Sequence, residues 1–241
     1  MMYQERIYRH HVCSPSLSSF RVAVKETDLH IQAGRILEKE TTASIITHRN
    51  EIETCIERYP DILTSLSPIR IKAPLPRIIR EMFSAGEKAN VGPMAAVAGA
   101  VAEHVCRDLL SFSDQVIVEN GGDIFLKVDH PVTIGIFAGA SPLSMKIGLK
   151  INHPGEPFSI CTSSGTIGHS LSFGKSDAVC IVASSGALAD AAATSVGNRV
   201  SSEKDIRHAL SFGQTIEGVK GICIIKNCAT GFWGDLEVAR L

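Results

Sequence analysis

Strand-like runs in this chain come in pairs, and helical segments separate the pairs. Residues 20–33 alternate apolar and polar side chains around the polar segment Glu-Thr-Asp, which predicts a β-hairpin with its turn at that segment. Four more strand-like runs lie between residues 115 and 151. Others follow at residues 177–184, 218–227 and 231–238. Because neighbouring strands joined by short turns pair antiparallel, the sequence predicts an α+β fold with mostly antiparallel sheet.

Helical spacing appears between these strand pairs. Residues 41–60 place isoleucines near one face and end at Pro60, and residues 93–110 begin with proline, which suits the first helical position. Residues 187–198 and 205–213 predict two more helices. The helix 187–198 consists almost entirely of small side chains, so another segment or a ligand can approach its backbone closely.

The composition is that of an ordinary globular protein. The 241 residues are 44% hydrophobic and 20% charged, and we expect one domain, 1–241. With a net charge of −1 and no block of Lys or Arg, the sequence favours neither nucleic acid nor an anionic membrane as a partner. No run of 18 apolar residues and no secretory signal is seen, so we expect a cytoplasmic protein.

Cysteine usage argues against a redox or metal motif. The seven cysteines include no C-x-x-C pair and lie mostly in apolar runs such as "AVCIVA" and "GICII". We therefore predict that they are reduced core residues.

Two segments offer groups that suit an anionic ligand. Asn120-Gly121-Gly122-Asp123 joins two predicted strands, and such a turn is also a common structural hairpin. The segment 161–176 is rich in Ser, Thr and Gly, whose hydroxyls and amides can bind an anion or be solvated in a loop.

Asp190 and Thr194 lie one turn apart on the predicted small-residue helix. A carboxylate and a hydroxyl on one face suit Mg²⁺, which takes few protein ligands and keeps water and phosphate as the others. The alternative is structural: an acidic residue favoured by the helix dipole and a threonine bonded to the preceding turn.

Together these segments resemble the ApbE superfamily, the FAD:protein FMN transferases. The resemblance is carried, in chain order, by "KETDLHI", "VGPMAAVAGAVAE", "VENGGDIFL", "SSGTIGHSLSFGKSDAV" and "ALADAAAT". It extends from about residue 20 to the end and is nearest to an uncharacterised ApbE-like branch. It implies a T-fold-like α+β protein of two related halves, with a boundary near residue 130 and helices on one layer.

The resemblance also implies a site. Asp190, Thr194 and the Met94 backbone carbonyl would hold Mg²⁺ beside the pyrophosphate of FAD or a related flavin nucleotide such as FMN. The nucleotide pocket would be lined by residues of the turn and the loop, namely Asn120, Gly121, Gly122, Asp123, Thr162, Ser163, Ser164 and Gly165. His169 matches the family's histidine and is the candidate catalytic residue.

This sequence departs from the transferase pattern at several positions. Val91 and Ala95 stand where the family has serine and lysine, and "HSLSF" keeps only the histidine of the H-x-x-D-P segment. Because transfer needs groups that neutralise phosphate and accept a proton, we expect nucleotide binding without FMN transfer.

Two other function classes are open. One is a non-catalytic accessory protein, which the resemblance links to sulfide assimilation and homocysteine formation. The other is a serine hydrolase using Ser170 and His169, although Ser172 stands where the nucleophile elbow needs glycine. Pairing of sheet edges favours a homodimer.

Overall fold

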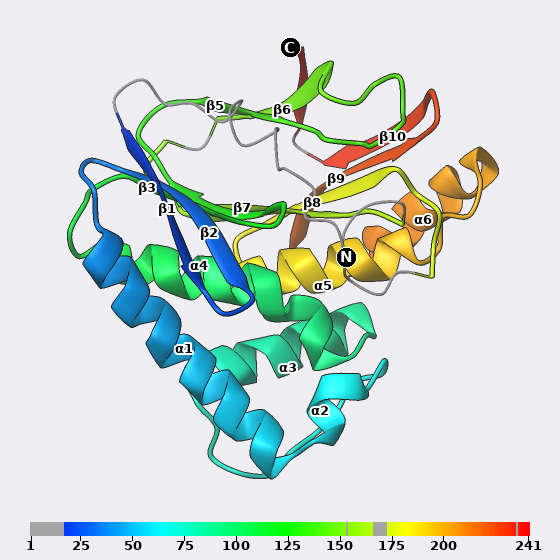
Figure 1. Cartoon of the computed structure of the whole chain (residues 1–241). Coiled ribbons are helices and arrows are strands. Elements are labelled where there is room, and N and C mark those ends of the chain that lie inside the picture. The colour runs from blue at the N-terminus through cyan, green and yellow to red at the C-terminus, as the bar shows by residue number, and fades with distance from the viewer. Residues whose placement is uncertain (1–16, 153, 166–172, 235) are drawn as a thin grey trace.

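A computed structural model describes residues 17–152, 154–165, 173–234 and 236–241. Its main feature is an eight-stranded sheet with strand order β1-β2-β3-β4-β7-β8-β9-β10, in which all neighbours are antiparallel (Figure 1). The strands are β1 (Ser18–Val24), β2 (Thr27–Ala33), β3 (Val116–Asn120), β4 (Asp123–Lys127), β7 (Phe158–Ser163), β8 (Ala178–Ala183), β9 (Val219–Lys226) and β10 (Ala229–Gly234). The predicted α+β class with antiparallel sheet is confirmed.

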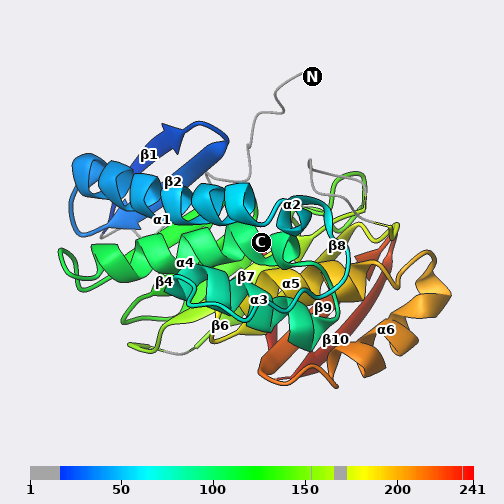
Figure 2. The same cartoon turned by 90° about the horizontal axis from the view of Figure 1, so that it is seen from below.

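Helices cover one face of this sheet (Figures 1 and 2). Two helices, α4 (Val97–Leu109) and α5 (Gly186–Gly197), pack side by side against the central strands β3, β4, β7 and β8. Their small side chains, such as Ala100 and Ala189, are fully buried, so the two helices approach each other and the sheet closely. The remaining helices are α1 (Glu38–Arg58), α2 (Asp61–Thr64), α3 (Arg77–Ala89) and α6 (Ile206–Gly213), with 3-10 turns η2 (Pro93–Ala96) and η3 (Glu203–Asp205).

A small sheet covers the opposite face. Its order is β11-β6-β5, and its strands are β5 (Val132–Gly135), β6 (Ile147–Ile151) and β11 (Glu237–Arg240). Leu126 and Ile160 of the large sheet pack with Leu149 of the small one in a second hydrophobic core. The strand runs 132–138 and 145–151 therefore leave the main sheet, which sequence periodicity does not reveal.

The order strand, strand, helices, strand, strand occurs twice in the large sheet. It first runs from β1 to β4 and then from β7 to β10, with β5 and β6 between the two. Helix α4 is the last helix of the first series and α5 is the first helix of the second series. The two helices begin beside each other near the centre of the sheet, where β4 pairs with β7.

Three sequence expectations need correction. The turn of the first hairpin is formed by Lys25 and Glu26, because Val24 pairs with Thr27 and Lys25 takes the positive φ of 52°. The predicted helix 93–110 begins as a 3-10 turn. Residues 231–238 are not one strand, since β10 ends at Gly234 and β11 joins the small sheet.

The cysteine prediction is confirmed for five residues and wrong for one. Among the described residues the cysteines are free thiols, and all but one are buried: Cys55, Cys106, Cys161, Cys180 and Cys223. Cys228 is exposed because it lies in the turn between β9 and β10. Cys13 lies outside the described residues.

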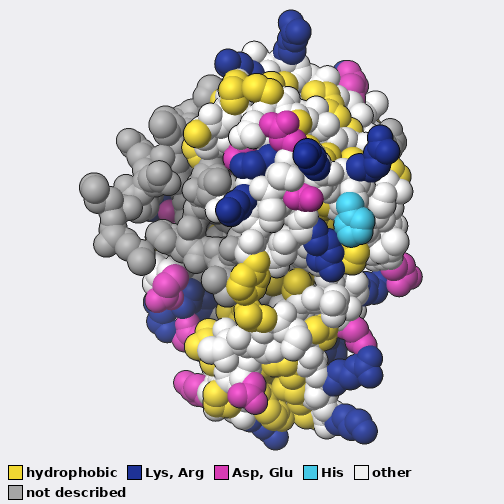
Figure 3. Space-filling model, turned by 90° about the vertical axis from the view of Figure 1, so that its right-hand side faces the viewer, with side chains coloured by type: hydrophobic (Ala, Val, Ile, Leu, Met, Phe, Trp, Pro, Cys, Tyr) yellow, Lys and Arg dark blue, Asp and Glu magenta, His cyan; other side chains and the backbone are white. Residues whose placement is uncertain are grey.

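The surface carries mixed charge. On the face in Figure 3, acidic and basic side chains are interspersed with hydrophobic ones. Within the described part of the chain, no helix combines the length and apolar character needed to cross a membrane.

Candidate functional site

The turn between β3 and β4 brings two polar side chains together at the strand ends. Gly121 and Gly122 have φ of 70° and 111°, left-handed values at consecutive positions that favour glycine in a tight hairpin. Asn120 pairs directly with Asp123 across this turn, so their side chains lie on the same face of the sheet. That face is the helical one, because Asn120 Nδ2 donates to the Ala98 carbonyl at 3.0 Å.

Asp123 lies beneath this turn and is almost fully buried. Burial raises the pKa of its carboxyl well above the ordinary value, and the negative charge of Asp190 raises it further. A hydrogen bond from the Cys161 thiol and one from the Thr162 backbone N–H oppose the shift. The negative charges of Asp123 and Asp190 therefore disfavour each other.

Asp190 projects from the first turns of α5 toward the start of α4. Its Oδ2 accepts the Gly99 N–H at 3.0 Å. Burial raises the pKa of Asp190 to about 7, and N–H groups of Gly99 and Ala98 limit the rise. Thr194 follows one turn later on α5 and is partly buried. Asp190 and Thr194 therefore lie one turn apart on a helix, as the sequence predicts.

A reciprocal contact involves Glu103, which sequence reasoning missed. Its Oε2 accepts the Gly186 N–H at 2.7 Å, so α4 caps the start of α5 as α5 caps the start of α4. The two segments share a pattern, "GAVAE" ending at Glu103 and "GALAD" ending at Asp190. The similarity of these two segments is the sequence signal that would have identified Glu103.

The two carboxylates differ in their counter-ions. Four residues after Glu103 stands Arg107, whose guanidinium donates to Glu103 Oε1 at 2.7 Å. Four residues after Asp190 stands Thr194, and within the described chain no ion pair to Asp190 is found. Asp190 is thus the member of this pair without a fixed cation.

The last two residues of β7, Thr162 and Ser163, point to opposite faces of the sheet. Ser163 Oγ would lie 3.5 Å from a Cβ at Gly197, near the end of α5. The Thr162 hydroxyl instead donates to Cys180 Sγ at 3.3 Å on the opposite face, so only the backbone of Thr162 reaches Asp123. Gly165 donates its N–H to the Ser176 carbonyl at 2.9 Å, and Ser164 lies between Ser163 and Gly165. His169 and Ser170 lie outside the described residues.

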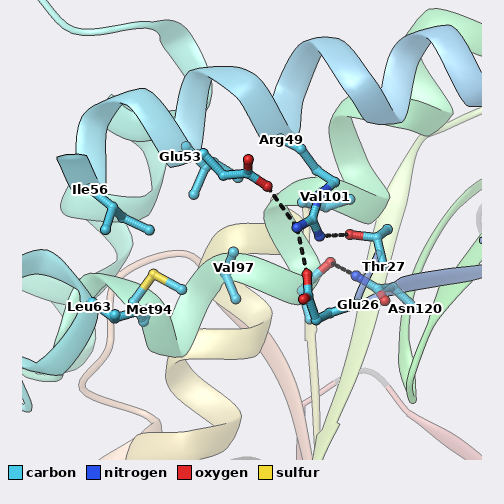
Figure 4. Close-up of a pocket in the computed structure, with 12 residues that line it drawn as sticks. Glu26, Thr27, Arg49, Glu53, Ile56, Leu63, Met94, Val97, Val101 and Asn120 are labelled. Atoms are coloured by element: carbon cyan, nitrogen blue, oxygen red, sulfur yellow. Dashed lines mark hydrogen bonds and ion pairs between the residues drawn. The ribbon is translucent and has the colours of Figure 1, made fainter. Parts of the chain in front are cut away.

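Met94 lies in η2, which packs against α5. Its carbonyl accepts the Val97 N–H, which leaves one lone pair of that oxygen for another partner. Its side chain and Asn120 line a cavity of about 400 Å³ between α1 and α4 (Figure 4).

Several polar groups described above offer oxygen atoms. Asp123 and Asp190 carboxylates, the Thr194 hydroxyl and the Met94 carbonyl are ligands of the kind Mg²⁺ prefers. Among the described residues no group of three or more His, Cys, Asp and Glu side chains is arranged to hold a metal. A cation here would therefore need ligands from backbone, hydroxyl, water or a bound phosphate.

Comparison with solved structures shows the same fold. The flavinyl transferase ApbE of Pseudomonas stutzeri matches with a TM-score of 0.59 and 12% identity, over 90% of this chain and 94% of that chain. The flavin transferase ApbE of Vibrio cholerae matches with a TM-score of 0.55 and 12% identity, over 93% and 96%.

The sequence relatives include proteins of Methanococcus species. A UPF0280 protein of Methanococcus aeolicus is 38% identical over 225 residues, which are 90% of each chain. One from Methanococcus vannielii is 40% identical over 214 residues, covering 86% of this chain and 87% of that protein. The family model described as "AbpE bacteria" matches residues 10–231. The chain therefore belongs to this ApbE-like family, in a branch whose curated members are the UPF0280 proteins.

Proposed function

We propose that this protein, built from two related halves, binds a flavin nucleotide or another pyrophosphate-containing nucleotide together with Mg²⁺. Asp190 and Thr194 would hold the cation with the Met94 carbonyl, and Asp123 would lie behind them. The turn 120–123 and residues 162–165 at the end of β7 would border the nucleotide. When bound, Mg²⁺ would offset the negative charge of the pyrophosphate.

This proposal rests on the Asp190 carboxylate, for which no ion pair is found among the described residues. Glu103 and Asp190 occupy reciprocal positions, yet only Glu103 has a cationic side chain four residues later. Asp123 and Asp190 disfavour each other's negative charge, and two such buried carboxylates are costly without a counter-charge. A divalent cation beside Asp190 would supply that charge, as Arg107 does for Glu103.

Family membership supports a nucleotide as the ligand. The structures that share this fold are named flavin transferases, and the family model spans most of this chain. The ligand is therefore proposed to be FAD or a similar nucleotide, with FMN as the smaller alternative.

We further propose that binding occurs without FMN transfer. Ala95 stands where the transferases have lysine, so a positive charge is missing near the proposed site. The segment that contains His169 keeps only that histidine of the family pattern. This chain retains the groups for holding a nucleotide and has lost groups that transfer needs.

Calorimetric titration of FAD, with and without Mg²⁺, tests the binding. Asp190→Ala should weaken binding only when Mg²⁺ is present, because the carboxylate acts through the metal. Glu237→Ala, which removes an exposed carboxylate on the distant β11, is the matched control. Equal affinities of wild type and Asp190→Ala under all conditions would refute the proposal.

Mass spectrometry tests the absence of transfer. After incubation with FAD, Mg²⁺ and a transferase target peptide, the peptide mass should stay unchanged. A mass increase corresponding to FMN would show that transfer does not need the missing lysine.

A further inference from the structure

Helix α1 lies beside α4 and buries a face that is half polar (Figure 2). Six side chains of α1 are buried, and three of them are polar, namely Thr41, Ser44 and His48. The large apolar ones are Ile45 and Ile52. Because a helix in a protein is stabilised mainly by the packing of its buried face, the position of α1 depends strongly on the contacts that its polar side chains make.

Both ring nitrogens of His48 point at carboxylates. Nε2 lies 2.9 Å from Asp108 Oδ2 on α4, and Nδ1 lies 3.3 Å from Glu51 Oε2, three residues later on α1. A neutral imidazole has one nitrogen without a hydrogen, and that nitrogen would direct its lone pair at a carboxylate oxygen. The geometry is therefore that of the doubly protonated imidazolium, which donates from both nitrogens.

The surroundings of His48 favour this charge. Burial opposes the charged ring and lowers the pKa of His48, but the hydrogen bonds and negative charges of Asp108 and Glu51 outweigh burial and raise the pKa above the ordinary 6.5. In turn, the hydrogen bond from His48 lowers the pKa of Asp108. Asp108 therefore stays ionised at neutral pH and faces a positively charged partner.

Asp108 receives two hydrogen bonds from α1. The Ser44 hydroxyl donates to Asp108 Oδ2 at 2.6 Å, so a single carboxylate oxygen of α4 accepts from both Ser44 and His48. The third buried polar side chain, Thr41, donates to the Leu37 carbonyl at the start of its own helix. A neutral His48 ring can keep one of its two hydrogen bonds but loses the charge that strengthens it.

A second histidine extends this cluster to α3. The ring of His104 on α4 packs edge-on against the ring of His48, with the centroids 4.8 Å apart, and its Nε2 lies 2.6 Å from Glu81 Oε2 on α3. Among the described residues, the ionisable groups that face His48 are thus Asp108 and His104 from α4 and Glu51 from α1. The two carboxylates favour the charge of His48, and His104 would oppose it when protonated.

His48 belongs to the part of α1 that forms a wall of the 400 Å³ cavity. Arg49 follows it directly and Ile52 lies one turn later, and both line the cavity from α1 (Figure 4). Val97 and Val101 line it from α4. The distance between α1 and α4 therefore sets the width of this cavity.

We propose that protonated His48 holds α1 against α4, and that loss of its proton as the pH rises loosens α1 and makes the cavity more accessible. The inference goes beyond the proposed function and applies to any ligand that the cavity takes. Because the pKa of His48 is raised in the folded protein, its stabilising contribution is complete below pH 6.5 and is lost as the pH rises through the folded value.

Hydrogen exchange of the α1 amides, followed by mass spectrometry on both sides of neutral pH, tests the proposal. In wild type, the protection factors of residues 38–58 should fall several-fold as the pH rises. His48→Gln has no charge to lose, so its protection should be lower at the acidic end and should not change with pH. His208→Gln, which removes an exposed histidine on α6, is the matched control and should behave as wild type.

An NMR titration of the imidazole protons measures His48 in wild type, even if His48→Gln does not fold. The midpoint for His48 should lie above pH 6.5, and Asp108→Asn should lower it because the variant removes the negative charge. A midpoint at or below 6.5, or α1 protection in wild type that does not change with pH, would overturn the proposal. So would a folded His48→Gln that keeps the wild-type pH dependence. Neither measurement contains a nucleotide or Mg²⁺, so the proposed function is tested separately.

Discussion

A Cβ atom added to Gly99 would lie 2.2 Å from the Gly186 carbonyl oxygen, and one added to Gly186 would lie 2.2 Å from the Gly99 carbonyl oxygen. These reciprocal contacts lock α4 and α5 together at the point where each helix begins. No side chain fits between the two backbones.

Gly186→Ala should therefore destabilise the fold by about 3 kcal/mol, since the added methyl group forces two backbones apart. Urea denaturation measures this change. Gly197→Ala in the same helix is the control, because its Cβ would meet only ordinary contacts at 3.5 Å and beyond, and alanine is the better helix former. Equal stability of the two variants would contradict the close packing.

In the variant Thr194→Arg, the arginine guanidinium should take the place of the proposed cation beside Asp190. The variant puts a guanidinium four residues after Asp190, as Arg107 follows Glu103. Saturating Mg²⁺ at about 100 times its Kd should stabilise wild type by about 2.7 kcal/mol and leave Thr194→Arg unaffected. Thermal unfolding with and without Mg²⁺ tests this. Thr194→Leu, which removes the hydroxyl without adding charge, should respond weakly to Mg²⁺, and a full wild-type response in Thr194→Arg would contradict the assignment.

Acid should weaken the contact between α3 and α4. Burial opposes the charge of Glu81, but hydrogen bonds from His104 at 2.6 Å and Arg77 at 2.8 Å lower the pKa of Glu81 to about 2. Its stabilising effect is therefore complete above its unfolded pKa of about 4.5 and is lost as the pH falls toward 2.

Glu81→Gln should remove this part of the pH dependence and cost about 1 kcal/mol at neutral pH, since partial solvent contact screens the interaction. Denaturation at a series of pH values between neutral and acid measures the difference. Glu237→Gln, in an exposed ion pair with Lys150, should leave the profile unchanged. An unaltered profile in Glu81→Gln would refute the role of this carboxylate.

Thiol labelling should separate Cys228 from the buried cysteines. Burial raises the pKa of Cys106 and Cys161, which makes both thiols poor nucleophiles, whereas Cys228 is exposed. In a Cys13→Ser background, the native protein should show one fast-reacting thiol, and Cys228→Ser should abolish it. Several fast thiols in the native state would contradict the buried placement.

Local patterns predicted much of the fold because they depend on neighbouring residues. The alternation in residues 20–33 predicted the first hairpin, although its turn lies at Lys25 and Glu26. The small-residue helix with Asp190 and Thr194 forms as predicted. The small sheet was not predicted, because the strands that leave the main sheet have the same periodicity as those that stay.

Sequence patterns could not predict the features of the site that depend on long-range contacts. Glu103 and Arg107 resemble an ordinary ion pair along one helix, so nothing local shows that Glu103 caps a different helix. The cavity beside Arg49 is lined by residues from several elements that are distant in sequence. Only their packing brings a partly buried arginine beside a largely apolar cavity.

The exchange of carboxylates between α4 and α5 has a consequence for how the protein unfolds. Each half of the sheet supplies the acid that neutralises the other half's helix start, so neither half has a complete structure alone. Separating α4 from α5 would remove the caps from two helix starts and would expose Gly99 and Gly186 at the same time. We therefore expect the large sheet and its helices to unfold as one cooperative unit.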